Sequence, residues 1–211
     1  LIEAEKLKQQ LSLNLLQQQV NPHFLYNTLD NICALAELDE KETLIQLVMN
    51  LSSFYRSSLS NGKMHISIGQ ELEISRAYLE ILQIRYFHKF DFTITCPEAL
   101  KNYSCIKLLL QPILENSIYH GIKGLDRHGI LHIEAEDAGD CIRFTISDNG
   151  RGFSKEDYEK IWQQDADHFG IKSIQQRILL YYGPGYGLSM ESPQTGGCIT
   201  VITLPKQEGL P

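Results

Sequence analysis

Residues 141–153 have the sequence CIRFTISDNGRGF, and this stretch decides the fold. Every second residue of its first half is apolar and shares one side of a predicted strand: Ile142, Phe144 and Ile146. The same period of two places Asp148 on that side, where a carboxylate needs a hydrogen-bond donor. Gly150 and Gly152 follow, and glycine permits the close approach of a backbone to a ligand. We therefore expect a buried strand that ends at a ligand pocket, although an Asp-Asn-Gly turn at a strand end is also common.

The flanking residues predict a mixture of helices and strands. Alternating β-branched and aromatic residues predict further strands at 65–68, 90–96, 131–136, 188–191 and 199–204. Helices are expected at about 70–86, about 106–121 and from 169 to 182, with a loop over 148–169. Helices that are segregated from antiparallel strands indicate an α+β sandwich with a mixed, mostly antiparallel sheet.

Residues 1–59 predict two helices. Glycine is absent there and Pro22 is the only proline, while apolar residues recur every three or four positions. A turn near 38–39 joins the helices into an antiparallel hairpin, and residues 1–19 suit a coiled-coil segment. The wide apolar faces predict that two copies pair into a four-helix bundle.

Composition limits the class of protein. Hydrophobic residues make up 43% and charged residues 21% of the 211 residues, as in soluble globular proteins. Asn61-Gly62 ends the helical pattern, so we expect one domain over residues 1–61 and a second over 62–211. A net charge of -7 without a basic stripe argues against nucleic-acid binding. Five cysteines without a CxxC pair predict reduced thiols in the cytosol. The chain has no membrane-length apolar run and starts without methionine, so we expect a fragment whose membrane anchor lies upstream.

The segment QVNPHFLYN, residues 19–27, places a histidine on the first helical hairpin. Pro22 lacks a backbone N–H, so the helix is expected to begin or bend there, with His23 just beyond. His23 and Asn27 share one face, away from the stripe that contains Phe24, so the imidazole should be exposed. A neutral imidazole has a ring nitrogen whose lone pair can attack phosphorus. Taken alone, an exposed histidine on a helix usually has no such role.

A second polar face occurs in LQPILENSIYHG, residues 110–121. Asn116 and His120 lie one helical turn apart, and an amide oxygen suits Mg²⁺ while an imidazole can donate to a phosphate. The carboxylate of Asp148 would accept from the exocyclic amine of adenine, whereas guanine presents an oxygen there. The plain alternative for the helix is a polar face turned to solvent.

Two weaker elements complete the candidate pocket. Gly170 and Ile171 begin a helix whose N-terminal amides can hold phosphate oxygens. Thr195 and Gly196 precede the last strand, where small residues let the backbone approach a nucleotide. Either element alone would be an ordinary loop.

The order of three motifs, NPHFLYN, ENSIYHG and DNGRGF, resembles the sensor histidine kinases of the LytS/YesM type. These belong to the superfamily of ATPases shared with gyrase, the heat-shock chaperone and MutL. The resemblance covers nearly the whole chain. It implies that residues 1–61 form a dimerisation and phosphoacceptor hairpin. It also implies that residues 62–211 form an ATP-binding Bergerat-type sandwich with a mobile lid between Gly152 and Gly170.

The resemblance implies a role for each candidate residue. His23 would be the phosphoacceptor, Asn116 the Mg²⁺ ligand and Asp148 the residue that reads adenine. Asn27 would orient the imidazole or an attacking water, and Glu115 is the candidate general base. The other nucleotide-binding residues would be His120, Gly150, Gly152, Gly170, Ile171, Thr195 and Gly196.

The implied activity is ATP-dependent autophosphorylation of a homodimer, followed by transfer of the phosphoryl group to an aspartate of a response regulator. The chain would then be the cytoplasmic part of a bacterial inner- or plasma-membrane protein.

Three positions depart from the usual family pattern. Phe24 stands where many histidine kinases carry an acid, His168 replaces the first glycine of the lid, and Pro112 replaces a second polar residue. Two alternatives therefore stay open. One is a superfamily ATPase or protein-serine kinase that does not use His23, and the other is a nucleotide-binding interaction module without catalysis.

Overall fold

The computed structural model describes residues 22–58, 64–162 and 169–208. The predicted coiled-coil segment, the predicted domain boundary at 61–62 and His168 lie outside the described residues. The division of the chain into two domains therefore stays a prediction.

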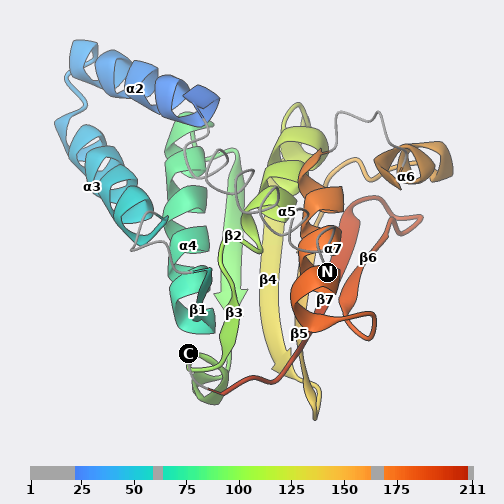
Figure 1. Ribbon diagram of the computed structural model, residues 1–211. Coiled ribbons are helices and arrows are strands. Elements are labelled where there is room, and N and C mark those ends of the chain that lie inside the picture. Colours follow the sequence, from blue (N-terminus) through green and yellow to red (C-terminus); the bar gives the residue numbers. More distant parts are fainter. Residues whose placement is uncertain (1–21, 59–63, 163–168, 209–211) are drawn as a thin grey trace.

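The predicted helical hairpin is present. It consists of α2 (Pro22–Glu37) and α3 (Lys41–Ser58), drawn in blue in Figure 1. Asp39 in the connecting turn has a φ of 58°, a left-handed conformation that aspartate tolerates better than most residues. The turn lies where the sequence places it.

The hairpin packs against α4 (Ile68–Arg85) through three aromatic rings. Phe24 of α2 lies 5.3 Å from Phe54 of α3 and 5.1 Å from Tyr78 of α4, measured between ring centroids. All three side chains are buried. Tilted ring pairs at such distances are favourable beyond the area that they bury. This cluster, which we call the aromatic contact, fixes the residue next to His23.

The outer side of the hairpin remains apolar. Its exposed large hydrophobic side chains are Tyr26, Leu29, Leu38, Ile45, Val48 and Met49. An exposed apolar surface of this kind is typical of an interaction face.

A five-stranded sheet forms the second layer, in the order β2-β4-β5-β7-β6. Its strands are β2 (Phe90–Thr95), β4 (Gly129–Asp137), β5 (Cys141–Asp148), β7 (Cys198–Pro205) and β6 (Gly187–Glu191). Within this sheet of the described residues, the β2–β4 pair is parallel and the other three pairs are antiparallel. A small antiparallel pair joins β1 (His65–Ser67) to β3 (Ser104–Ile106), and a short 3-10 helix, η2 (Glu98–Leu100), precedes β3. The predicted α+β class with a mixed, mostly antiparallel sheet is confirmed.

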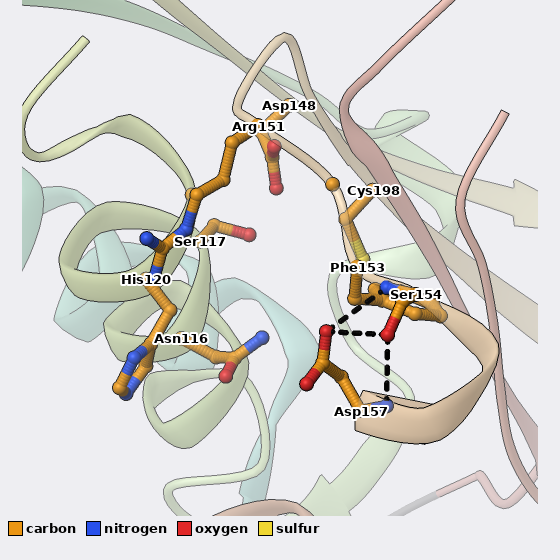
Figure 2. A pocket seen from close by; sticks show the side chains of 11 residues that line it. Asn116, Ser117, His120, Asp148, Arg151, Phe153, Ser154, Asp157 and Cys198 are labelled. Carbon is orange, nitrogen blue, oxygen red and sulfur yellow. Dashed lines mark hydrogen bonds between the residues drawn. The ribbon is translucent and has the colours of Figure 1, made fainter. Parts of the chain in front are cut away.

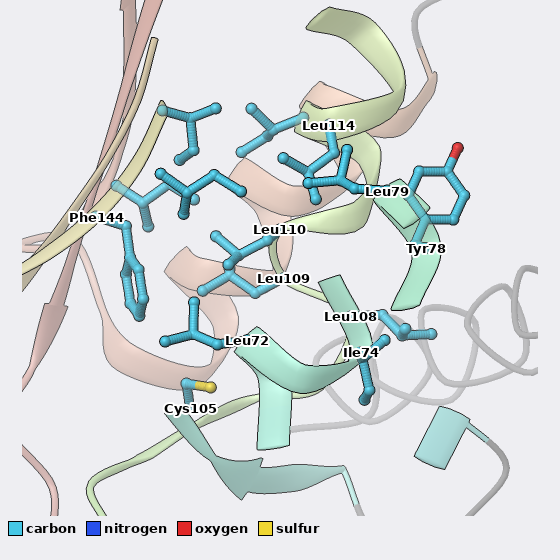
Figure 3. Close-up of a cluster of buried hydrophobic side chains, with 14 of the residues drawn as sticks. Leu72, Ile74, Tyr78, Leu79, Cys105, Leu108, Leu109, Leu110, Leu114 and Phe144 are labelled. Atoms are coloured by element: carbon cyan, nitrogen blue, oxygen red, sulfur yellow. The ribbon is translucent and has the colours of Figure 1, made fainter. Parts of the chain in front are cut away.

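Three helices cover one face of the sheet: α4, α5 (Gln111–Asn116) and α7 (Phe169–Tyr182) (Figure 1). Figure 3 shows the core between the layers, a single buried cluster that includes Leu79 of α4, Leu114 of α5 and Phe144 of β5. The buried alternate residues of β5 include Ile142, Phe144, Ile146 and Asp148, as the period of two predicts.

The prediction of one helix over 106–121 is wrong at its start. Leu108 has a φ of 55°, which no helix residue adopts. The buried Glu71 carboxylate accepts the N–H groups of Leu108 and Leu110 at 2.8 and 2.9 Å. The Arg177 guanidinium donates to the carbonyls of Leu108, at 3.2 Å, and Lys107. Two distant side chains thus satisfy the backbone of a buried turn that local sequence would make helical.

Two further elements differ from prediction. After α5 the helix continues as a π-helix, η3 (Ser117–Ile122), and such widened turns are frequent at functional sites. The region predicted as a loop over 148–169 contains a helix, α6 (Lys155–Trp162). Among the helices of the described residues, none combines the length and apolarity that crossing a membrane requires.

Candidate functional site

A cavity of about 710 Å³ opens between η3 and the loop that follows β5. Figure 2 shows the side chains around it. Its lining residues are Asn116, Ser117, His120, Gly121, Asp148, Arg151, Gly152, Phe153, Ser154, Asp157 and Cys198. Polar groups from three separate segments therefore converge on one hollow, as in ligand sites.

Asp148, the last residue of β5, forms the buried end of this cavity. Its side chain is only 9% exposed, and its Oδ1 accepts the N–H of Gly150 at 2.8 Å. Its Oδ2 is buried and has no hydrogen-bond partner among the described residues. Burial raises the pKa of Asp148, and the nearby Ser117 hydroxyl and the N–H groups of Gly150 and Cys198 offset this only in part; among the described residues, the Gly150 N–H is the one of these donors in hydrogen-bond geometry. The wall of the cavity therefore presents an acceptor that fits an N–H donor such as the amine of adenine.

Two glycines bring the backbone close to this carboxylate. A Cβ on Gly150 would lie 2.6 Å from Asp148 Oδ1 and 2.7 Å from the backbone of Gly121. Gly197 has a φ of +86°, and a Cβ there would lie 2.1 Å from the carbonyl oxygen of Asp148. The Gly197 N–H donates to the carbonyl of Gly150 at 2.9 Å. No larger residue fits either position, so the glycines hold the loop against the ends of β5 and β7.

Asn116 and His120 lie at the other end of the cavity, on α5 and η3. Both also line a smaller neighbouring cavity of about 170 Å³. The other residues of this second cavity are Pro112, Glu115, Tyr119, Gly170 and Ile171. Glu115 accepts a hydrogen bond from Gln111 Nε2 at 3.1 Å. The π-helical turn thus keeps Asn116 and His120 on one face, as predicted from an α-helical spacing.

The segment after the cavity loop is ordered by its own contacts. Ser154 and Asp157 bond to each other around the start of α6: the Asp157 carboxylate accepts the Ser154 hydroxyl at 2.7 Å. The Ser154 Oγ accepts the Asp157 N–H at 3.1 Å, which caps the helix. A second apolar cluster lies beneath α6 and contains Phe153, Tyr158, Trp162, Ile171, Leu188, Met190 and Cys198. The first half of the predicted lid is therefore docked on the body of the protein.

His23 is exposed in the first turn of α2, as predicted, and is not part of either cavity lining. Asn27 Nδ2 donates to the backbone carbonyl of His23 at 2.6 Å. The amide of Asn27 thus lies on the His23 face of the helix, with its nitrogen bonded to main chain rather than to the imidazole.

The structure gathers most of the predicted residues. Asn116, His120, Asp148 and Gly152 line the larger cavity, and Glu115, Gly170 and Ile171 line the smaller one. Gly150 lies behind Asp148. Thr195 and Gly196 line neither cavity, and Cys198 lies at the wall instead.

Sequence reasoning missed several lining residues, including Ser117, Cys198 and Asp157. Cys198 pairs with Asp148 in the register of β5 and β7, so aligning the two strands would have found it. No sequence pattern pointed to Asp157 as a lining residue, because the helix that contains it, α6, was not predicted. No three His, Cys, Asp or Glu side chains of the described residues cluster as a metal site, and the role of Asn116 as a Mg²⁺ ligand stays a prediction.

Two family models match consecutive parts of the chain. The family model "Histidine kinase" matches residues 11–90, and the model "Histidine kinase-, DNA gyrase B-, and HSP90-like ATPase" matches residues 103–208. The first match runs past the predicted boundary and includes α4.

The chain is similar to the sensor histidine kinase YesM of Bacillus subtilis, with 32% identity over 97% of this chain and 35% of the relative. It is 28% identical to the sensor protein LytS of Staphylococcus haemolyticus, over 92% of this chain and 34% of the relative. The chain thus spans about a third of the length of these relatives.

A solved histidine kinase domain from the blue-light activated kinase of Erythrobacter litoralis EL346 has the same fold. It is 18% identical, with a TM-score of 0.51 over 94% of this chain and 96% of that chain. Both family models, the YesM and LytS relatives and the shared fold agree with the motifs. The chain belongs to the histidine kinase-, DNA gyrase B- and HSP90-like ATPase family, and over most of its length it is similar to sensor histidine kinases of the LytS/YesM type.

Proposed function

We propose that this chain is the catalytic core of a two-component sensor histidine kinase. It phosphorylates its own His23 with ATP and passes the phosphoryl group to an aspartate of a response regulator. The observation that carries this proposal is the buried, unpaired Oδ2 of Asp148 on a cavity wall that also holds Asn116. An acceptor so placed selects an adenine base, and the exposed imidazole of His23 supplies the nucleophile.

Nucleotide binding is divided between the two ends of the cavity. Asp148 accepts the amine of adenine, with Gly150 and Gly152 shaping the wall. Asn116 holds Mg²⁺ through its amide oxygen, and His120 lies beside the phosphates. Gly170 and Ile171 offer the N-terminal amides of α7 to the phosphate end. Bound Mg²⁺ neutralises charge on the transferred group.

The transfer forms a bond between a ring nitrogen of His23 and the γ-phosphorus, and breaks the bond from that phosphorus to the departing oxygen of ADP. The protein contributes positioning and charge stabilisation. Glu115, at the smaller cavity, accepts the proton that the imidazole releases. The Asn27 amide lies within hydrogen-bond reach of the His23 main chain, so its oxygen can orient the imidazole or, in dephosphorylation of the regulator, an attacking water.

A second copy of the chain covers the apolar outer side of the hairpin and forms a four-helix bundle. Six exposed large hydrophobic residues on α2, α3 and their turn support this pairing. The response regulator docks near His23 on the same bundle. The rest of the protein carries the membrane anchor and the sensor, and this core lies in the cytoplasm.

Incubation with γ-labelled ATP tests the proposal. We expect acid-labile label on the wild-type chain, none on His23→Gln, and equal ATP binding by both in calorimetry. Acid-stable label would indicate a serine kinase. Nucleotide binding without any label would indicate an interaction module. Label that persists on His23→Gln would remove His23 from the reaction.

A further inference from the structure

The lining of the larger cavity carries an uneven set of charges. Its described residues include two carboxylates, from Asp148 and Asp157, and one permanently charged cation, Arg151. A triphosphate carries several negative charges, and the chain as a whole is negative, with a net charge of -7. A site that accepts such a ligand needs local positive charge.

The backbone around Arg151 is held in place. Its N–H donates to the carbonyl of Gly121 at 3.1 Å, which ties the loop to η3. Gly150 before it leaves no room for a side chain, as a Cβ would lie 2.7 Å from the backbone of Gly121. The root of the Arg151 side chain is therefore fixed relative to η3, while the side chain itself is exposed.

Figure 2 shows the Arg151 side chain reaching from the loop toward η3, the helix that carries His120. Both residues line the same cavity, and the guanidinium lies beside His120, turned away from the carboxylate of Asp148 (Figure 2). Within the described ranges, Arg151 forms no ion pair, whereas Arg143 pairs with Glu136 at 2.7 Å. The guanidinium thus lines the cavity without an ion pair to a described carboxylate.

We propose that Arg151 binds the polyphosphate chain of the nucleotide through its guanidinium. This inference rests on the proposed function, because it assigns Asp148 to the base and the opposite end of the cavity to the phosphates. A guanidinium offers several N–H donors in one plane, a geometry that suits phosphate oxygens. Arg151 then discriminates between nucleotides and nucleosides, a task that Asp148 cannot perform.

The test is calorimetric titration of the 211-residue chain with ATP, ADP and adenosine, using Arg151→Gln, Arg151→Lys and the control Arg143→Gln. The control removes the same charge from a paired position on the sheet surface. We expect Arg151→Gln to weaken ATP binding between about 10- and 150-fold, since hydrogen bonds to charged groups are worth roughly 1.5–3 kcal/mol. Adenosine binding should change less than about twofold. Arg151→Lys should recover part of the ATP affinity, because it keeps the charge and loses the planar fork.

Unchanged ATP affinity in Arg151→Gln would overturn the inference, and so would an equal loss for ATP and adenosine. Retained adenosine binding shows that the variant is folded. A wild-type chain that binds neither ATP nor adenosine would instead reject the proposed function. Raising the salt concentration should weaken ATP binding more in the wild type than in Arg151→Gln.

Discussion

Replacing Asp148 by asparagine should change which base the chain binds. The Gly150 N–H holds Asp148 Oδ1 at 2.8 Å, so an asparagine at this position places its own oxygen there. Its Nδ2 then occupies the site of the unpaired Oδ2. An N–H donor would face the amine of adenine, while the same donor would complement the carbonyl oxygen of hypoxanthine.

The expected loss follows from one hydrogen bond to a charged group. Such a bond is worth roughly 1.5–3 kcal/mol, which is about 10- to 150-fold in ATP affinity. Calorimetric titration with ATP and inosine triphosphate measures the ratio of the two affinities, with Asp140→Asn as the control. Asp140 is exposed in the turn at the far end of β5. An unchanged ratio of ATP to inosine triphosphate affinity in Asp148→Asn would refute the assignment of this carboxylate to the base.

The raised pKa of Asp148 adds a dependence on pH. Because burial disfavours the ionised form, the carboxylate opposes folding at neutral pH, and this cost disappears as pH falls through the raised pKa. Protonation also removes the acceptor, so ATP affinity should fall in that same window, above the pH at which an ordinary aspartate titrates. Asp148→Asn should unfold at a higher temperature than the wild type without nucleotide, and its ATP affinity should not vary with pH there. A lower Tm for this variant would contradict the burial argument.

Three other predictions concern packing and reactivity. Phe24→Ala should lower the free energy of unfolding, measured by urea denaturation, by about 3–5 kcal/mol, because the aromatic contact loses a buried ring. A change below about 1 kcal/mol would mean that the hairpin does not pack on α4. Gly197→Ala should lower the free energy of unfolding by at least about 2 kcal/mol more than Gly139→Ala in the same assay. Both glycines have a positive φ, but of the two only Gly197 lies against the backbone of Asp148. Equal losses for the two variants would contradict the close approach of Gly197 to Asp148. Burial raises the pKa of Cys198 to about 11, so iodoacetamide at pH 8 should label exposed Cys33 much faster, as mass spectrometry of the peptides can establish.

Local patterns were sufficient where one period dominates a segment. The alternation through Ile142, Phe144 and Ile146 placed Asp148 inward because a strand has no other way to arrange a buried face. The hairpin and the exposure of His23 followed in the same way from helical spacing. The chemistry of the cavity therefore came largely from residues next to strongly periodic elements.

Tertiary contacts decided the parts that sequence missed. The residues before α5 are good helix formers, yet the turn at Leu108 exists because Glu71, far away in the chain, takes two of its backbone N–H groups. The helix α6 forms in a polar segment with few apolar residues, and its stability depends on the cluster with Ile171 and Met190. Neither arrangement has a local signature.

The turn at 107–110 links three helices, α4, α5 and α7, into one rigid unit. Glu71 belongs to α4, Arg177 belongs to α7, and both bond to the backbone that leads into α5. These directional bonds are buried, so sliding one helix past another would leave charged groups unsatisfied, at a cost of several kcal/mol. The aromatic contact between the hairpin and α4 consists of packed rings, whose attraction is less directional than these hydrogen bonds. A rotation imposed on the α2–α3 hairpin would therefore shift the packing of Phe24, Phe54 and Tyr78. The cavity wall that carries Asn116 would move together with α4.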